Sequence, residues 1–306
     1  MLFRPTHRGN ADCYSGPMAE QSLELAQPWG RLAGTLLRPE GEGPWPGMLL
    51  IAGSGPTDRD GNNALLPAPI ANLQRLAQAL AARGIASLRY DKRGVGGSVF
   101  PGLSEETLRF EHLVDDAVLL ARHLAVQPGV GRVSLAGHSE GALVAALAAD
   151  DAQAQGVVSI SGAGCRASAL MRRQIQAQLP PDLAQPALAA LDALEAQQAV
   201  PDVPESLVLL FRPTVQPYLM SWFRHDPAQV LAQTDVPVLL LHGAADAQVG
   251  PEQARLLHAA RPDARLAIVP GMDHLLSIGG DIPQGTRIVA AEVADWLQEL
   301  DVRMAV

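Results

Sequence analysis

Short apolar stretches alternate along the chain with longer stretches in which apolar residues recur at helical spacing. The short stretches predict strands of a parallel sheet, since such strands are buried on both faces. They lie at Gly47–Ala52, Ile85–Tyr90, Val133–Ala136, Gly156–Ile160, Val236–His242 and Arg265–Val269. The longer stretches predict helices. They lie at Ile70–Ala82, Leu108–Val126, Ala142–Ala149, Pro251–Ala260 and Thr286–Leu300.

This alternation predicts an α/β protein with a mostly parallel, twisted sheet and helices on both faces. Two strands at the start, Ser22–Ala26 and Arg31–Arg38, flank a turn and predict an antiparallel hairpin. Residues 164–234 break the alternation, because they contain no strand candidate and are too long for a plain connection. We expect short helices there, forming a cap inserted into a core made of residues 18–163 and 235–306.

Length and composition are consistent with one folded domain with an insertion, and they argue against nucleic acid as a partner. The 306 residues are 48% hydrophobic and 18% charged, which supplies a large core and argues against a disordered chain. The net charge of −9 at pH 7, without a block of Lys and Arg, argues against nucleic-acid binding. No apolar run is long enough to span a membrane. These features say little about a neutral small-molecule substrate, and homo-oligomerisation stays open.

The N-terminus and the cysteines carry little chemistry. Residues 1–17 are polar, contain Gly and Pro and lack periodicity, so we expect a disordered tail. They have no apolar core of a secretory signal, and we expect a cytoplasmic protein. Met18 precedes the first strand-like stretch, so either Met1 or Met18 is the start of translation, which N-terminal sequencing decides. Cys13 and Cys165 make no disulfide framework, and no His/Cys cluster indicates zinc.

The segment Gly137–His138–Ser139–Glu140–Gly141 is a G-x-S-x-G motif between an apolar strand and a helix of small residues. In that context the motif predicts a nucleophile elbow, a sharp turn that strains the serine backbone and exposes its hydroxyl. Glycines are needed at Gly137 and Gly141, because side chains there would collide where strand and helix almost touch. Ser139 is therefore the candidate nucleophile.

The serine needs a base and the base needs an orienting acid, in the chain order Ser, acid, His for this architecture. Of eight histidines, His274 alone lies in the loop after the last strand, at the sheet edge beside the elbow. We expect it to be the general base. Asp246 lies in the loop just after Val236–His242 and is the expected acid. Asp235 lies at the opposite edge, and Asp273 adjoins the base too closely to turn toward its ring.

A tetrahedral intermediate needs two backbone N–H donors for its oxyanion. The amide of Glu140, directly after the nucleophile, is the first candidate. The second should follow the strand Gly47–Ala52, and we select Ser54. Many esterases and lipases have H-G-G-G at this place, whereas this chain has Ala52–Gly53–Ser54–Gly55 without the histidine.

Four of the twelve aromatic residues of the chain cluster at residues 211–223 of the expected cap, and three of these are pocket candidates. These three and two loop residues are the candidates for a substrate pocket over the serine. The candidates are Gly55, His138, Tyr218, Trp222 and Phe223. The alternative for the aromatic residues is that they pack the cap onto the core.

Two charged loops contain glycine. Tyr90–Ser98 lacks the G-K-[ST] of a phosphate loop, and we expect Asp91 and Arg93 to pair and hold it beside the pocket. Asp58–Asn62 predicts a hydrogen-bonded turn.

From Ser22 to Leu300 the chain resembles the α/β-hydrolase family, with elbow, acid loop and histidine loop in the family's order. The segments Gly53–Asn62, Asp91–Gly96 and Gly137–Gly141 resemble bacterial carboxylesterases of the serine-aminopeptidase-like and prolyl-oligopeptidase-like branch. The resemblance implies the α/β-hydrolase fold and hydrolysis of a small ester, with a short acyl group, through an acyl-enzyme. It implies no metal and no organic cofactor.

Other activities stay open because this fold hosts several. A thioesterase acting on coenzyme A esters would offer basic residues to the nucleotide, and none cluster in the sequence. Peptidases of this branch usually carry a gating domain, for which the chain has no room. A non-catalytic binding protein would not need the serine, acid and histidine together, and a fluorophosphonate probe would leave its serine unmodified.

Overall fold

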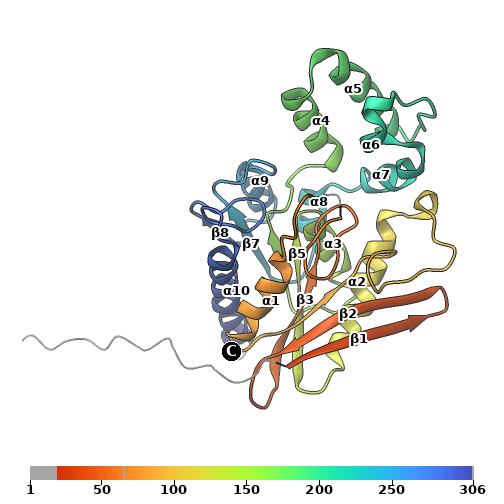
Figure 1. The fold of residues 1–306 in the computed structure, drawn as a ribbon. Helices are drawn as coiled ribbons and strands as arrows, with labels where there is room; N and C mark the ends of the chain where they lie inside the picture. The colour runs from red at the N-terminus through yellow and green to blue at the C-terminus, as the bar shows by residue number, and fades with distance from the viewer. Residues whose placement is uncertain (1–18, 65, 305–306) are drawn as a thin grey trace, which may run out of the picture.

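An eight-stranded sheet forms the centre of the computed structural model, which describes residues 19–64 and 66–304 (Figure 1). The expected tail of residues 1–17, which contains Cys13, lies outside the described residues, and so does Met18. The strand order is β1-β2-β4-β3-β5-β6-β7-β8. The strands are β1 (Ala19–Gln27), β2 (Gly30–Arg38), β3 (Trp45–Ile51), β4 (Ala86–Tyr90), β5 (Val130–His138), β6 (Val157–Ile160), β7 (Val238–Gly243) and β8 (Arg265–Val269).

The first two strands form the expected antiparallel hairpin, and β2 also pairs antiparallel with β4. From β4 onward all neighbours are parallel, which confirms the mostly parallel sheet. The carboxyl ends of β3, β5, β7 and β8 therefore lie at one edge, and the loops that follow them meet there.

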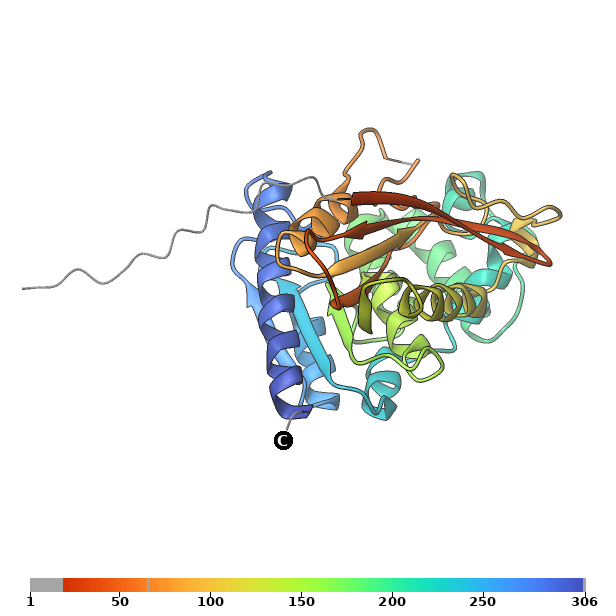
Figure 2. The ribbon, with the colours of Figure 1, turned by 90° about the horizontal axis from the view of Figure 1, so that it is seen from below.

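Helices cover both faces of the sheet (Figure 2). On one face, α2 (Phe110–Ala125) and α3 (Glu140–Ala148) pack against alternate strand residues such as Leu49 and Leu135. On the other, α1 (Asn72–Ala81) and α10 (Ile282–Met304) pack against residues such as Met48. The strand residues divide between the two faces because the pleat of a strand points successive side chains to opposite sides of the sheet.

The last helix differs most from its expected bounds. We expected it to begin at Thr286, but it begins at Ile282, four residues earlier. Its second residue, Pro283, does not break it, because the first turn of a helix needs no hydrogen bond from that nitrogen. No helix within residues 19–64 and 66–304 has the length and hydropathy that crossing a bilayer requires.

Residues 164–234 hold helices between β6 and β7. These include α4 (Ala167–Gln178), α5 (Pro181–Glu195), α6 (Val208–Phe211), α7 (Gln216–Trp222) and α8 (Pro227–Gln233). Figure 1 shows α4 to α7 gathered at one end of the molecule, beyond the sheet. This helical insertion has an apolar cluster of its own, in which Leu191, Leu194 and Phe211 are fully buried. The helix α9 (Glu252–Ala260) belongs to the sheet region and lies between β7 and β8.

Candidate active site

Ser139 lies between the end of β5 and the start of α3 with φ 54° and ψ −118°, a strained backbone for a residue with a side chain. A Cβ placed on Gly137 would lie 1.9 Å from the carbonyl oxygen of Gly141. A Cβ on Gly141 would lie 2.4 Å from that of Ile51. Strand and helix thus approach so closely that only glycine fits at both positions, as the motif predicts.

The loop after β7 brings Asp246 to the loop after β8. Its Oδ2 lies 2.8 Å from Nδ1 of His274, and its Oδ1 accepts the backbone N–H groups of Gln248 and Val249 at 3.0 and 2.8 Å. Burial by itself would raise the pKa of Asp246, but the hydrogen bond from His274, the positive charge that this ring can carry and the Val249 N–H hold it below its ordinary value. The ionised carboxylate can only accept, so Nδ1 of His274 carries the ring proton and Nε2 keeps its lone pair.

Two further histidines support these loops. His138 lies 2.8 Å from the carbonyl oxygen of His274 through Nε2, and His242 lies 2.6 Å from that of Val249 through Nε2. A carbonyl oxygen only accepts, so both rings carry their proton on Nε2. Burial lowers the pKa of His138 to about 3 and also lowers that of His242, which keeps both rings neutral. Both rings thus bind loop backbone, and Nε2 of His242 also lies 3.6 Å from Oδ2 of Asp246.

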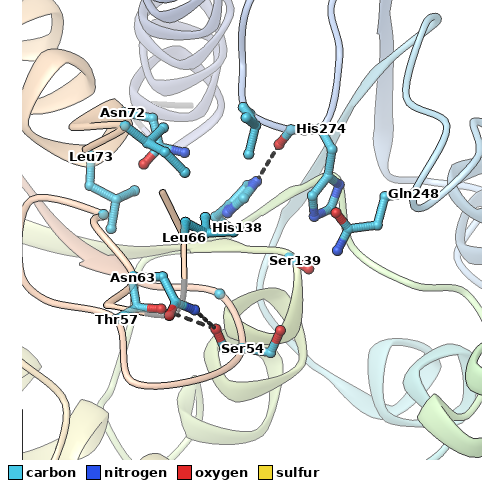
Figure 3. Close-up of a pocket in the computed structure, with 14 residues that line it drawn as sticks. Ser54, Thr57, Asn63, Leu66, Asn72, Leu73, His138, Ser139, Gln248 and His274 are labelled. Carbon is cyan, nitrogen blue, oxygen red and sulfur yellow. Dashed lines mark hydrogen bonds between the residues drawn. The ribbon is translucent and has the colours of Figure 1, made fainter. Parts of the chain in front are cut away.

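Two cavities meet at Ser139. The smaller, of about 170 Å³, also reaches His274 and His138, and Figure 3 shows these side chains around it. The larger, of about 360 Å³, extends under the helical insertion. Ser54, Ser139 and Gln248 line both cavities. A group bound to the serine therefore has room on two sides.

The predicted pocket residues divide between the two cavities. Gly55, Tyr218 and Trp222 line the larger, and His138 lines the smaller. The expectation that Phe223 lines the pocket is corrected by the structure, since Phe223 is 2% exposed and packs within the apolar cluster of the helical insertion. One residue after Trp222 it lies about 100° further around the helical turn, so it faces the insertion's interior.

The two candidate oxyanion donors come from different elements. Ser54 follows β3, and Glu140 is the first residue of α3, where backbone N–H groups have no partner within the helix. A Cβ on Gly53 would lie 3.3 Å from Cβ of Ser139, so the loop that carries Ser54 passes directly beside the nucleophile. The structure thus brings Ser54, Ser139 and Glu140 to one place.

The expectation that Asp91 pairs with Arg93 is wrong. Asp91 binds Arg59 instead, with Nη2 and Oδ2 2.6 Å apart and a further bond from the Arg59 backbone N–H. Arg93 binds the buried Asp116 of α2 through both oxygens at 2.7 Å. Each arginine meets its carboxylate in a two-bonded fork.

The predicted hydrogen-bonded turn at Asp58–Asn62 is confirmed. Oδ1 of Asp58 accepts the backbone N–H groups of Asp60 and Asn62, both at 2.9 Å.

Sequence reasoning passed over two residues at the site. Gln248 lines both cavities two residues after the acid, and nothing in its sequence pattern distinguishes it. Lys92 is buried and binds the carboxylate of Glu140 at 2.8 Å. Its signal was a lysine inside the glycine-containing loop Tyr90–Ser98, where a long charged side chain is normally exposed.

Comparison with known families shows that residues 70–279 match the model of the family described as serine aminopeptidase, S33. Esterase EstD of Thermotoga maritima is 29% identical to this chain over 252 residues. The alignment covers 81% of this chain but only 58% of the length of EstD, so the chain spans less than two thirds of this relative.

Solved structures share the fold at low sequence identity. Est1E from Butyrivibrio proteoclasticus is 16% identical, with a TM-score of 0.62 over 92% of this chain and 99% of that one. A proline iminopeptidase from Mycobacterium smegmatis is 16% identical, with a TM-score of 0.64 over 93% of this chain and 100% of that one. At these identities the likeness establishes the architecture, which is the α/β-hydrolase fold.

Proposed function

The chain belongs to the serine aminopeptidase (S33) family of α/β hydrolases, and we propose that it hydrolyses carboxylic esters with Ser139 as nucleophile. The observation that carries the proposal is the bond of 2.8 Å between Asp246 and His274, whose ring lines the same cavity as the strained Ser139. The similarity to an esterase supports the choice of ester substrates.

In the proposed mechanism, Nε2 of His274 takes the proton of the Ser139 hydroxyl as its oxygen attacks the ester carbonyl carbon. The carbonyl oxygen becomes an oxyanion, which the N–H groups of Ser54 and Glu140 bind. The tetrahedral intermediate collapses when His274 returns the proton to the leaving alcohol. The acyl group stays on Ser139 until a water, deprotonated by His274, attacks its carbonyl carbon. The bond between the acyl group and the Ser139 oxygen then breaks as His274 returns the proton to that oxygen, and the carboxylic acid leaves.

The chemistry assigns the two cavities to the two halves of the ester. His274 must reach the leaving alcohol to protonate it, and His274 lines the smaller cavity, of about 170 Å³. We therefore place the alcohol there and the acyl group in the larger cavity, of about 360 Å³, beneath the helical insertion. The insertion, residues 164–234, acts in this proposal as a cap that shields the acyl group from water.

The larger cavity determines which acyl lengths we expect the protein to accept. The short-acyl preference expected from the family resemblance stays a prediction. The space that would hold the acyl group is the larger of the two cavities and favours longer acyl groups. Its lining is largely apolar and includes Leu143, Leu170, Met171 and Trp222. Acyl groups longer than acetyl should therefore bind with favourable burial, at about 0.8 kcal/mol for each methylene that leaves water. The cytoplasmic location also stays a prediction from the sequence.

An aminopeptidase is supported less well than an esterase. An aminopeptidase needs a negative group to bind the substrate's terminal ammonium. Among the described residues that line the two cavities, Glu140 is the only acid. Its two carboxylate oxygens already accept hydrogen bonds from Lys92 and Tyr218, each at 2.8 Å.

The test is hydrolysis of p-nitrophenyl esters over a series of acyl lengths by the native chain and by Ser139→Ala. We expect activity in the native chain alone, rising from acetyl toward longer acyl groups that still fit the larger cavity. A falling series from acetyl onward would support the short-acyl prediction and refute our assignment of the cavities. Equal activity in both proteins would show that another residue is the nucleophile. Inactivity of both, with thioesters or amides cleaved by the native chain, would replace the ester with those substrates.

A further inference from the structure

Lys92 and Glu140 form a buried ion pair beside the two candidate oxyanion donors, which are the N–H groups of Ser54 and Glu140. Nζ of Lys92 is 2.8 Å from Oε1 of Glu140, and the two side chains are 8% and 1% exposed. Burying two charges costs solvation energy that well-packed apolar residues of the same size would not lose, so stability alone does not explain such a pair. The pair's position suggests another role.

The same ammonium group also donates a hydrogen bond to the carbonyl oxygen of Gly53. That carbonyl belongs to the peptide group whose nitrogen is the amide of Ser54. In a planar trans peptide the C=O and N–H bonds point in opposite directions. Because the carbonyl points at the buried Lys92, the Ser54 N–H points away from Lys92. Ser54 itself lines both cavities that meet at Ser139.

The next peptide group is held as well. The carbonyl oxygen of Ser54 accepts bonds from Oγ1 of Thr57 at 3.0 Å and Nδ2 of Asn63 at 3.3 Å (Figure 3). Neither peptide plane beside Ser54 can turn without breaking one of these bonds. Lys92 also contacts Glu140, the residue that supplies the second oxyanion donor.

We propose that Lys92 is a positioning residue for the oxyanion hole, because one ammonium group fixes the Gly53–Ser54 peptide and the side chain of Glu140 together. The two donors come from the loop after β3 and the start of α3, and Lys92 ties these elements to each other. The inference rests on the proposed function, in which those two amides bind the oxyanion.

The helical insertion takes part in the same network. The hydroxyl of Tyr218, on α7, donates to Oε2 of Glu140 at 2.8 Å. The carboxylate therefore receives a donor on each oxygen, one from the core and one from the insertion. Lys92 holds the core side of this arrangement.

The test compares two double variants that each remove a buried ion pair from the same loop. Lys92→Met with Glu140→Gln removes the bond to Gly53 without leaving a single charge buried. Arg93→Met with Asp116→Asn is the matched control, since that pair has side chains 9% and 1% exposed and does not touch Gly53 or Ser54. The measurements are kcat and KM for a p-nitrophenyl ester, inhibition by a trifluoromethyl ketone that forms an oxyanion on the serine, and the melting temperature.

We expect the double variant Lys92→Met with Glu140→Gln to lose about 10²-fold in kcat, the range seen when an oxyanion donor is lost. Its KM should change less than about twofold. Binding of the trifluoromethyl ketone should weaken in parallel with kcat. The control should keep kcat within about threefold of the native value, which is small beside that loss. A Lys92 variant that folds and keeps native kcat, or one that changes only KM, overturns the proposal. So does an equal loss of kcat in the control.

Two further measurements keep the inference testable. If the double variant does not fold, the single variant Lys92→Arg takes its place. It keeps the positive charge opposite Glu140 but replaces the compact ammonium by a planar guanidinium. A native kcat in Lys92→Arg would overturn the proposal. If the native chain cleaves no ester, the proposed function fails. The rate at which a fluorophosphonate labels Ser139 then replaces kcat, and equal rates in native and Lys92 variant contradict the role of Lys92. A native chain that is neither active nor labelled refutes both proposals.

Discussion

Acidification should destabilise this fold through His138 in particular. The ring is buried in the neutral form, with a pKa of about 3, whereas in the unfolded chain it titrates near its ordinary value of about 6.5. Between these values the unfolded chain binds a proton that the folded chain does not bind. The free energy of unfolding therefore falls as pH falls below about 6.5, by about 1.4 kcal/mol per pH unit.

From pH 7.5 to pH 5.0 this contribution amounts to about 2 kcal/mol, since 1.5 pH units lie below the unfolded pKa. Other groups act at the same time. Burial raises the pKa of Asp116 to about 6, so the folded chain binds that proton more readily and gains stability over the same interval. The total for the native chain is thus a sum, and a variant is needed to isolate His138.

His138→Gln removes the titration and keeps a side-chain N–H that can donate to the carbonyl of His274. The assay is urea unfolding of native and variant chains at pH 7.5 and pH 5.0, with reversibility checked by refolding. We expect the native chain to lose about 2 kcal/mol more than the variant between the two pH values. Losses equal to within about 0.5 kcal/mol would refute the reasoning, because the ring would then titrate alike in folded and unfolded chains.

Two further substitutions test the site. Gly137→Ala places a Cβ where it would lie 1.9 Å from the carbonyl oxygen of Gly141. We therefore expect loss of the cooperative melting transition or a much lower melting temperature. A native melting curve would contradict the steric argument. Asp246→Asn can donate to Nδ1 of His274 and so favours the wrong ring tautomer, which should lower kcat about 10⁴-fold. Circular dichroism should show the fold intact, and kcat within about tenfold of native would mean that another group orients the histidine.

The parts of the site that follow local rules could be predicted from the sequence. Ser139 carries the glycine pattern of an elbow, and Asp246 and His274 follow strands that the apolar pattern locates. Since parallel strands end at one edge of a sheet, the order of elements alone brings these loops together. The strands themselves were expected within a few residues of their observed bounds.

Contacts between distant segments could not be predicted in this way. Lys92 and Glu140 are 48 residues apart, and Arg59 and Asp91 are 32 apart. Nothing in a local pattern says which carboxylate a buried cation will meet, so Asp91 was assigned to its near neighbour instead. The prediction for Phe223 was wrong for a similar reason. A shift of one residue along a helical turn decides whether an aromatic ring faces a cavity or the interior of the insertion.

Trapping the acyl-enzyme tests the central claim most directly. The native chain is mixed with p-nitrophenyl acetate, quenched in acid within the first turnovers, digested and analysed by mass spectrometry, with Ser139→Ala treated alike. We predict one acetyl group on the peptide that contains Ser139, and no acetylated serine in the variant. Rapid release of p-nitrophenol by the native chain with acetyl on a different residue, or at an equal rate by Ser139→Ala, would contradict a mechanism through Ser139.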